Sequence, residues 1–564
     1  MANNKEIALV IVVCYVIDDL NSQLDIQLLY YLRRDQVCLL QEASNKSPAA
    51  QSSSFNSLLC SCLTVYTHGK PPMQEPSHFR SKHTVWSRAG VPGPKSKPFV
   101  GITPLYRTKG MIQTDLDLVK KYGRCFGIYQ GLVPTLVISD PETIKEVMVK
   151  EFSNCPNRRN VLPSRNELKH SLIHLRDDHW RFIRNTLLPT FSSGKMRALN
   201  SIFKRSYEQL VENLQPKAEA GEPIEFKQVF GAYTMDIIAS AGFGLDVDSQ
   251  KNPENKFTKY AKMLFDFKFS RLIILIMAFP SVDIIFNWFN ISPNNNRTIM
   301  DFFKSVVKTA IGMRNETDQK PKDLLQMMLN AHNDKDVNDN EAVHQYEKDP
   351  EKWKKRGLTL DEITGNAILF LLVGYDTTAS ALTFVSYCLA TNPDCQEKLI
   401  KEIDSVLGKD CPNYDNIQKM DYLDRVFSET LRLYAPGGRT GRQVEKEMTV
   451  NGYKIPKNAE IMIPIHAIHR DPEFWEEPDK FDPERFTPEN KAKRHPYCYL
   501  PFGHGPRSCI GMRLAQVEAK YALVYILQHY RFKTCAETEI PLQLTKGGIT
   551  KPVNGMKLKL ESRV

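Results

Sequence analysis

The N-terminal part of the sequence lacks an apolar run long enough to cross a bilayer. Residues 7–17 are apolar, but the run ends at Asp18 and Asp19, whereas a membrane-spanning helix needs about 20 residues. Lys5 beside Glu6 gives only a weak positive flank and no clear cleavage site follows, so a signal peptide is not indicated. Residues 1–88 are therefore expected to form an N-terminal segment of uncertain order, with a short or lost membrane anchor.

Paired cysteines and interdomain linkers are also absent. The chain has 12 cysteines, of which only Cys60 and Cys62 lie close together. This pattern excludes the disulfide framework of a small secreted protein and predicts a reducing compartment. After about residue 90, no Gly/Ser-rich linker or internal repeat divides the chain of 564 residues. One large catalytic domain, residues 89–564, is the simplest organisation.

The aromatic residues do not alternate with clusters of basic residues, as they do in proteins that bind single-stranded nucleic acid. The formal net charge of +10 therefore indicates anionic lipid or an acidic protein as a partner. No nucleic-acid partner is expected.

The most informative feature that is present is a glycine-rich loop with one cysteine, residues 502–511. Gly503, Gly505 and Gly511 let the loop fold tightly around Cys509 and aim backbone N–H groups at its sulfur. Arg507 precedes the cysteine by two residues, and apolar residues at helical spacing follow it. The loop predicts a thiolate that binds a metal; the alternative is a buried free cysteine in a glycine-rich turn.

A second feature is a long apolar helix, predicted over residues 360–391. Thr359 and Glu362 have capping-box spacing at its start, and Asn392 and a proline stop it. Between residues 368 and 380 the only charge is Asp376, which Thr377 follows. Burying an acid is costly without a partner or a purpose. The residues alone leave two readings open, a catalytic pair or a local hydrogen bond in an irregular helix.

Two further pairs lie on predicted helical faces. Glu429 and Arg432 are three residues apart, and Trp180 and Arg184 are four apart, so the members of each pair share a face. The first pair can form an ion pair, and the second can donate hydrogen bonds to one carboxylate. Such spacings are common on ordinary amphipathic helices, so they indicate little alone.

Together these features resemble the cytochrome P450 superfamily, whose fingerprint F-x-x-G-x-R-x-C-x-G matches residues 502–511. The resemblance covers about residue 89 to the C-terminus. It implies a mainly α fold with small β-sheets, in which haem b lies between the long central helix and the helix after the cysteine loop. Cys509 would be the axial thiolate ligand of the iron.

The same resemblance implies roles for the other features. Asp376 would relay protons, and Thr377 would hydrogen-bond the oxygen that is activated. Val373 departs from the family, which has Ala or Gly at this place. Arg485 would complete a structural network that braces the proximal side of the haem, together with Glu429 and Arg432. The residues implied in binding the haem propionates are Trp180, Arg184, Arg442 and Arg507.

Segments outside these motifs resemble family 3, the microsomal oxidisers of steroids and xenobiotics, and its near relative thromboxane synthase. The segments that resemble family 3 are residues 122–129, 156–159, 189–195, 230–243 and 545–548, and those that resemble the synthase are residues 393–398 and 535–544. The proline-rich residues 91–98 resemble the stiff hinge that follows the anchor in microsomal members. The synthase rearranges an endoperoxide without dioxygen or electrons and lacks the acid–alcohol pair, so Asp376 and Thr377 favour monooxygenation.

The resemblance predicts a monooxygenase that inserts one oxygen atom from O2 into lipophilic substrates such as steroids, fatty acids or xenobiotics. Electrons would come from NADPH through NADPH–cytochrome P450 reductase, with cytochrome b5 as a further candidate partner. The predicted location is the endoplasmic reticulum membrane, with the catalytic domain facing the cytosol. Two alternatives stay open: an isomerase of prostaglandin-type endoperoxides that needs no reductase, and a haem sensor or carrier without turnover.

Three surface features complete the predictions. The apolar residues 267–289, interrupted by a proline, are expected to form a lid that touches the membrane, or else ordinary core. The charge-rich residues 333–356 are expected to form an exposed loop. A basic landing patch for the reductase, or else an ordinary solvated surface, is expected from Arg181, Lys491, Lys493, Arg494 and Lys520.

Overall fold

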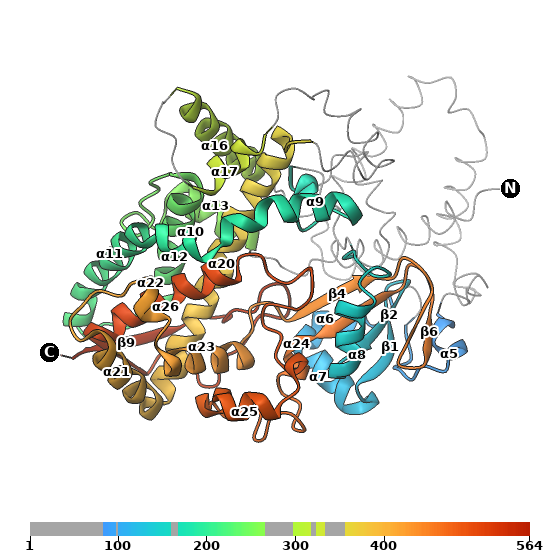
Figure 1. Ribbon diagram of the computed structural model, residues 1–564. Coiled ribbons are helices and arrows are strands. Elements are labelled where there is room, and N and C mark those ends of the chain that lie inside the picture. The colour runs from blue at the N-terminus through green and yellow to red at the C-terminus, as the bar shows by residue number, and fades with distance from the viewer. Residues whose placement is uncertain are drawn as a thin grey trace, which may run out of the picture. The chain divides into compact units, whose positions relative to one another are not determined.

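Helices make up one side of the molecule, and a small sheet with short helices makes up the other (Figure 1). The computed structural model describes residues 83–97, 100–159, 167–265, 297–316, 323–332 and 356–563. The prediction of a mainly α fold with small β-sheets is confirmed.

The helices are assigned by their first and last residues. In the first half of the chain they are α5 (Val85–Arg88), α6 (Thr103–Lys109), α7 (Met111–Tyr122), α8 (Pro141–Lys145), α9 (Asp177–Leu187), α10 (Ser193–Ala198), α11 (Asn200–Glu219), α12 (Phe226–Phe243) and α13 (Lys256–Phe265). In the second half they are α16 (Arg297–Asn315), α17 (Leu324–Asn330), α20 (Leu360–Thr391), α21 (Pro393–Leu407), α22 (Tyr414–Ile417), α23 (Asp421–Leu433), α24 (Ile465–Ile468), α25 (Pro488–Lys493) and α26 (Met512–His529).

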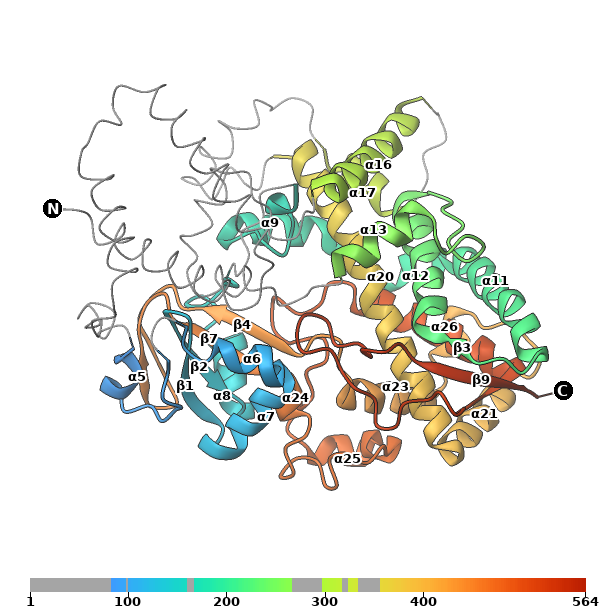
Figure 2. The same ribbon diagram turned by 180° about the vertical axis from the view of Figure 1, so that it is seen from behind.

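The long central helix α20 has the predicted ends. Thr359 Oγ1 accepts a hydrogen bond from the N–H of Glu362 at 3.2 Å, and the Glu362 carboxylate accepts one from the N–H of Thr359 at 2.9 Å. The helix stops at Asn392 before a proline. Because α12, α16, α23 and α26 all pack against it, α20 is apolar on nearly every face, and Figure 2 shows it passing between α12 and α23.

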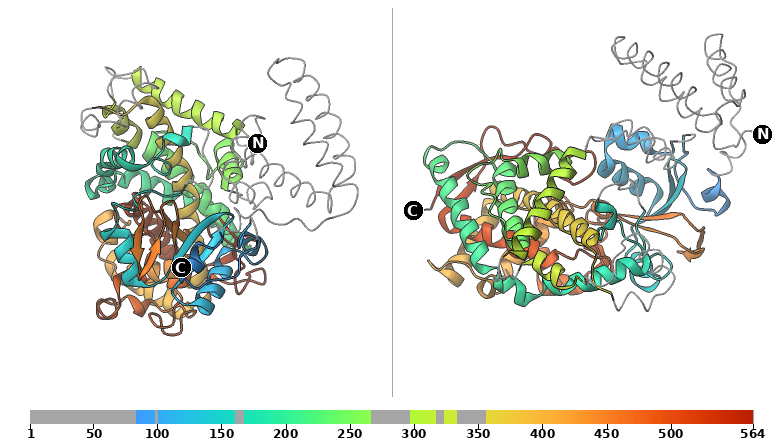
Figure 3. Two further views of the ribbon diagram at one scale, coloured as in Figure 1. Left: turned by 90° about the vertical axis from the view of Figure 1, so that its right-hand side faces the viewer. Right: turned by 90° about the horizontal axis from the view of Figure 1, so that it is seen from above.

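A four-stranded sheet forms the other part of the fold. Its order is β1 (Cys125–Gln130), β2 (Val133–Ile138), β7 (Glu460–Pro464) and β4 (Arg439–Gln443). The β1–β2 pair is antiparallel, β2 runs parallel to β7, and β7 runs antiparallel to β4. Smaller sheets pair β3 (Ile224–Glu225) with β9 (Lys557–Ser562), β9 with β8 (Tyr530–Lys533), and β5 (Met448–Val450) with β6 (Tyr453–Ile455). Two further views show the sheet beside the helical part (Figure 3).

The hydrophobic core has separate clusters on the two sides of α20. The larger one joins α20 with α11, α12, α21, α23 and α26. The second joins α20 with α9, α16 and α17. Within the described ranges, α20 is the one helix long and apolar enough to cross a membrane, but 83% of its most apolar window is buried, so it is a core helix.

The first described residues pack on the sheet. Trp86 of α5 is 3% exposed, and its Nε1–H donates to the carbonyl of Ile128 at 2.8 Å. The proline-rich segment follows it, and the carbonyl of Pro92 accepts a hydrogen bond from the N–H of Gly127 at 2.8 Å. The predicted domain boundary between residues 88 and 89 stays a prediction.

Other predicted segments lie outside the described residues. These are the lid at residues 267–289, most of the N-terminal segment and all but the last residue of the charged insert. That last residue, Arg356, was expected in an exposed loop. It is instead 8% exposed, and its guanidinium binds the Glu362 carboxylate at 2.5 and 2.9 Å. Glu362 holds it there because a buried carboxylate needs a cation.

Candidate functional site

The cysteine loop leads into α26, as predicted. Gly503 and Gly505 have φ angles of 68° and 71°, which residues with a side chain rarely adopt. A Cβ at Gly505 would also lie 2.3 Å from a backbone carbonyl oxygen. Gly511 has a φ of −89°, so its backbone conformation does not require glycine. The N–H of Cys509 donates to the carbonyl of Phe502 at 2.9 Å and closes the loop.

The Cys509 side chain is exposed, and Ile510 beside it packs against the same apolar cluster as α20. Although the side chain is exposed, the protein around it displaces part of the surrounding water, and this desolvation raises the pKa of the Cys509 thiol. A hydrogen bond from the N–H of Gly511 and the charges of Arg158 and Arg184 oppose this rise. The described part of the chain has no group of three His, Cys, Asp or Glu side chains that could hold a metal ion. An iron bound at Cys509 therefore needs further ligands of the kind that a porphyrin supplies.

Four arginines lie near one another beside this loop, and two of them contact the Trp180 ring. The guanidinium of Arg507 lies 4.0 Å from the centre of the Trp180 ring, and that of Arg184 lies 5.8 Å from it. Arg158 Nη2 donates to the carbonyl of Arg507 at 3.1 Å. Arg442 is 1% exposed, and within the described part of the chain its buried Nε and Nη2 atoms have no hydrogen-bond partner. The structure thus brings the predicted propionate-binding residues into one neighbourhood.

The arginine cluster (Arg158, Arg184, Arg442 and Arg507) holds several positive charges close together. Across the described ranges, no carboxylate forms an ion pair with any of the four. Burial lowers the pKa of Arg507 to about 8, and the charges of Arg158 and Arg442 add to the effect. Burial and the charge of Arg158 lower the pKa of Arg442 to about 10. Like charges held together in a poorly solvated place favour an anion, so the cluster fits the two propionates of a haem.

Arg158 is the member of this cluster that the sequence did not predict. It lies in residues 156–159, a segment without helical spacing that could relate it to Trp180 or Cys509. Its only signal was its place in one of the family-like segments.

The acid–alcohol pair on α20 is split between two faces of the helix, because neighbouring positions are about 100° apart. Val373 is 36% exposed, and Thr377 beside it is half-buried and donates its Oγ1–H to the Val373 carbonyl at 2.7 Å. Asp376 is 3% exposed, and its Oδ1 lies 2.7 Å from Nζ of Lys227 in α12. The buried acid therefore has a cationic partner, which the sequence did not predict.

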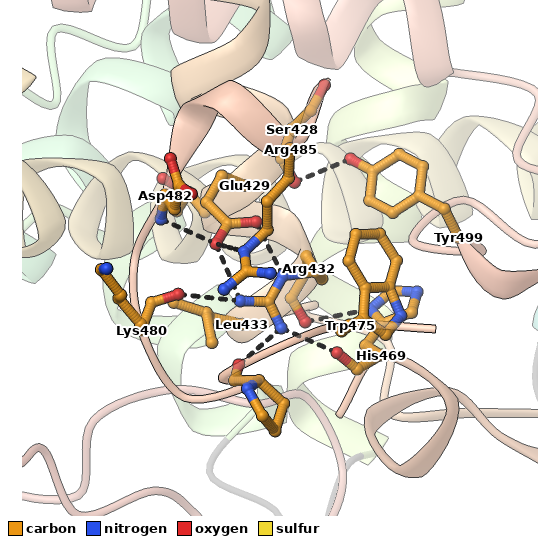
Figure 4. Close-up of polar contacts among 12 residues, drawn as sticks. Ser428, Glu429, Arg432, Leu433, His469, Trp475, Lys480, Asp482, Arg485 and Tyr499 are labelled. Carbon is orange, nitrogen blue, oxygen red and sulfur yellow. Dashed lines mark hydrogen bonds and ion pairs between the residues drawn. The ribbon is translucent and has the colours of Figure 1, made fainter. Parts of the chain in front are cut away.

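The predicted Glu-Arg-Arg network forms between α23 and the segment that carries Arg485 (Figure 4). Both guanidinium contacts from Arg432 to the Glu429 carboxylate are 2.7 Å long, and both side chains are fully buried. Arg485 Nε lies 3.4 Å from Glu429 Oε1. Arg485 comes from the short 3-10 helix Pro483–Phe486.

His469 joins this network to the cysteine loop. Its Nε2 accepts a hydrogen bond from the N–H of Leu500 at 2.8 Å, so its proton is on Nδ1, which lies 3.0 Å from the carbonyl of Arg432. Burial holds the pKa of His469 well below its usual range, so the ring is neutral. The neutral imidazole of His469 therefore links Arg432 to Leu500, which lies just before the cysteine loop.

The predicted basic patch is only partly a surface. Lys491 and Lys493 of α25 are exposed, and Arg181 is exposed in an ion pair with Asp178. Arg494 is half-buried, with its guanidinium 3.8 Å from the centre of the Trp475 ring. The prediction that Lys520 belongs to the patch is wrong, because this side chain is 5% exposed and paired with Asp424 of α23.

A cavity of about 460 Å³ adjoins the arginine cluster. Arg158 belongs both to the cluster and to the wall of the cavity. The wall also includes the apolar side chains of Met111, Ile112, Met462 and Ile549.

Comparison with known proteins agrees with this geometry. The profile of the family described as Cytochrome P450 matches residues 91–560. Cytochrome P450 3A11 of Mus musculus is 42% identical over 487 residues, 86% of this chain and 93% of the relative. Cytochrome P450 3A6 of Oryctolagus cuniculus is 40% identical over 487 residues, 86% and 94% of the two chains. Cytochrome P450 3A1 of Rattus norvegicus is 42% identical over 486 residues, 85% and 93% of the two chains.

These relatives do not favour the isomerase alternative. They support a haem enzyme with a cysteine thiolate as the axial ligand of its iron. The chain belongs to the cytochrome P450 family and is a monooxygenase that resembles the 3A members of that family.

Proposed function

We propose that this cytochrome P450 inserts one oxygen atom from O2 into lipophilic substrates of the steroid, fatty-acid or xenobiotic class. NADPH–cytochrome P450 reductase delivers the electrons, and cytochrome b5 is an additional partner. The enzyme works at the endoplasmic reticulum membrane with its catalytic domain facing the cytosol. The observation that carries the proposal is a cluster of arginines, none of them ion-paired to a carboxylate of the described ranges, beside a loop that presents a single cysteine.

Cys509 is the proposed metal ligand, and the haem supplies the iron at which oxygen is activated. Trp180, Arg184, Arg442 and Arg507 hold the propionates, with Arg158 as a further donor. The unpaired Nε and Nη2 atoms of Arg442 suit this role, because a buried donor without an acceptor is costly.

Two residues of α20 are proposed to handle protons. Thr377 lies on the more exposed face of α20. Its O–H donates to the Val373 carbonyl, and its oxygen can accept a further hydrogen bond. Asp376 supplies the proton from the side of α12. The two methyl groups of Val373 occupy space on the same exposed face of α20.

The exposed lysines support the proposed electron donor. The cavity of about 460 Å³ has the size of sites that bind drug-sized ligands, but its wall contains neither Cys509 nor a residue of α20. The exposed Lys491 and Lys493 of α25 give a basic surface that attracts an acidic protein.

The test combines a spectrum with a turnover assay. The reduced protein with carbon monoxide should show the difference spectrum of thiolate ligation, and Cys509→Ala should lose it. Oxidised product should form only with NADPH and reductase. Retention of the spectrum by Cys509→Ala would refute the ligand assignment. Rearrangement of an endoperoxide without NADPH, or a lack of turnover with all lipophilic compounds, would refute the monooxygenase.

A further inference from the structure

Helices α12 and α20 pack side by side (Figure 2), and they approach closely next to Asp376. A Cβ at Gly374 would lie 2.9 Å from the side chain of Ile238, and one at Gly231 would lie 3.2 Å from the hydroxyl of Tyr375. Since glycine on both helices permits this approach, short side chains of α12 can reach the backbone of α20.

Two side chains of α12 bind carbonyl groups of this segment. Thr234 Oγ1 donates to the carbonyl of Tyr375 at 2.9 Å. Lys227 Nζ donates to the carbonyl of Asp376 at 3.2 Å and to its Oδ1 at 2.7 Å. Lys227 therefore fixes both the backbone and the side chain of Asp376.

The two carboxylate oxygens of Asp376 are not equivalent. Oδ1 is bound to Lys227, whereas Oδ2 is buried and has no hydrogen-bond partner among the residues that the structure describes. A buried oxygen without a partner is costly, and it is the position at which a proton can be taken up and released. The ammonium on Oδ1 compensates the charge that remains when the proton leaves.

We propose that Lys227 is a positioning residue for oxygen activation: it holds the Asp376 carboxylate so that Oδ2 is the oxygen that carries the relayed proton. This inference rests on the proposed monooxygenase function. Lys227 itself touches neither substrate nor haem in this scheme. It acts through Asp376.

Lys227→Met tests the proposal, because methionine keeps most of the length and removes the charge. The product formed per NADPH consumed should fall by about tenfold, less than the about hundredfold cost of removing a general acid itself. Haem content and the carbon monoxide spectrum should stay unchanged. The matched control is Lys217→Met, which removes an exposed lysine. Unchanged coupling in Lys227→Met would overturn the proposal.

A second measurement is independent of turnover. Lys227→Met leaves the buried Asp376 carboxylate without its cation, so the midpoint of thermal unfolding should fall. The double variant Lys227→Met/Asp376→Asn removes that uncompensated charge and should regain part of the loss. The other charges that act on the pair are Glu225 and Lys551, which all variants retain.

The two measurements separate the possible failures. If no substrate is oxidised but Lys227→Met lowers the unfolding midpoint and the double variant regains part of it, the monooxygenase is wrong and the ion pair is right. If oxidation is confirmed and Lys227→Met keeps the coupling of the wild-type protein, the positioning role is wrong. If Lys227→Met does not fold, Lys227→Arg serves instead. It keeps the charge and should keep haem while coupling falls; wild-type coupling in that variant would also overturn the proposal.

Discussion

Arg442 has a buried guanidinium group with two nitrogen atoms that lack acceptors. We predict that the apoprotein binds haem at least about tenfold more tightly than haem dimethyl ester, because a hydrogen bond to a charged group contributes about 1.5–3 kcal/mol. The ester has the same ring but no carboxylates. Titration followed at the Soret band measures both affinities.

The matched variants are Arg442→Leu and, at an exposed position, Arg107→Leu. The first should narrow the difference between haem and its ester, and the second should not. Equal affinity for the two compounds in the wild-type protein would show that the arginine cluster does not bind propionates.

Glu518 is a buried acid that the proposed chemistry does not use. It is 2% exposed in α26, and its Oε1 has no hydrogen-bond partner. Burial raises the pKa of Glu518 well above its usual range. Above about pH 4.3 the unfolded chain loses this proton while the folded protein keeps it, so the folded state binds more protons and stability falls as pH rises.

We predict that Glu518→Met stabilises the protein at pH 7 by about 1–3 kcal/mol, the cost of an unsatisfied buried polar group. Thermal unfolding between pH 5 and pH 8 measures this gain, which should increase with pH. Glu518→Gln, which keeps the polar atoms but cannot titrate, should remove only the pH dependence. A gain in Glu518→Met that does not change with pH would contradict a raised pKa.

Helix α23 presents its Glu429 and Arg432 to the element that carries Arg485. We predict that Glu429→Ala yields little haem-loaded protein, because loss of one partner leaves buried charge uncompensated at a cost of about 3–5 kcal/mol. The ratio of haem to protein after purification measures the effect.

Glu476→Ala is the control for this prediction, because Glu476 is exposed in the same region. That variant should load haem normally. Normal haem content in Glu429→Ala would mean that the network does not support the proximal side of the site.

The ends of α20 could be predicted because their signals are local. A capping box and a proline act within a few residues, and the structure confirms both ends. Trp180 and Arg184 were likewise predictable as neighbours, since they share one helical face. Lys227 and Arg158 could not be related to the site in this way, because tertiary packing alone brings them there.

The burial of Lys520 is a further case in which tertiary packing, and not the local sequence, determines the surroundings of a side chain. Charge alone predicted an exposed residue, but residues 517–524 of α26 are all buried. A helix packed on several faces leaves no room for a solvated lysine, and Asp424 of α23 compensates its charge. Whether a charged residue on such a helix is exposed therefore depends on neighbouring helices that the sequence does not identify.

At the scale of the whole molecule, Trp86 of α5 belongs to the same folded unit as the sheet. The predicted boundary at residues 88 and 89 would exclude Trp86, although Trp86 is buried against the sheet and donates to the carbonyl of Ile128. A Cβ at Gly127 would lie 2.4 Å from the Trp86 ring, so the glycine leaves the space that the indole fills. The indole and its glycine therefore form one packing unit.

We predict that Trp86→Ala in the full chain lowers stability by about 3–5 kcal/mol, the usual cost of truncating a buried aromatic residue. The chain 89–564 should show the same loss, whereas the chain 83–564 should match the full protein. Arg88→Ala, at an exposed position of α5, should change little. The midpoint of thermal unfolding is measured for these four proteins and for the unmodified full chain. Equal midpoints for 83–564 and 89–564 would mean that the fold does not need Trp86, and the catalytic unit would then begin at the sequence-predicted boundary.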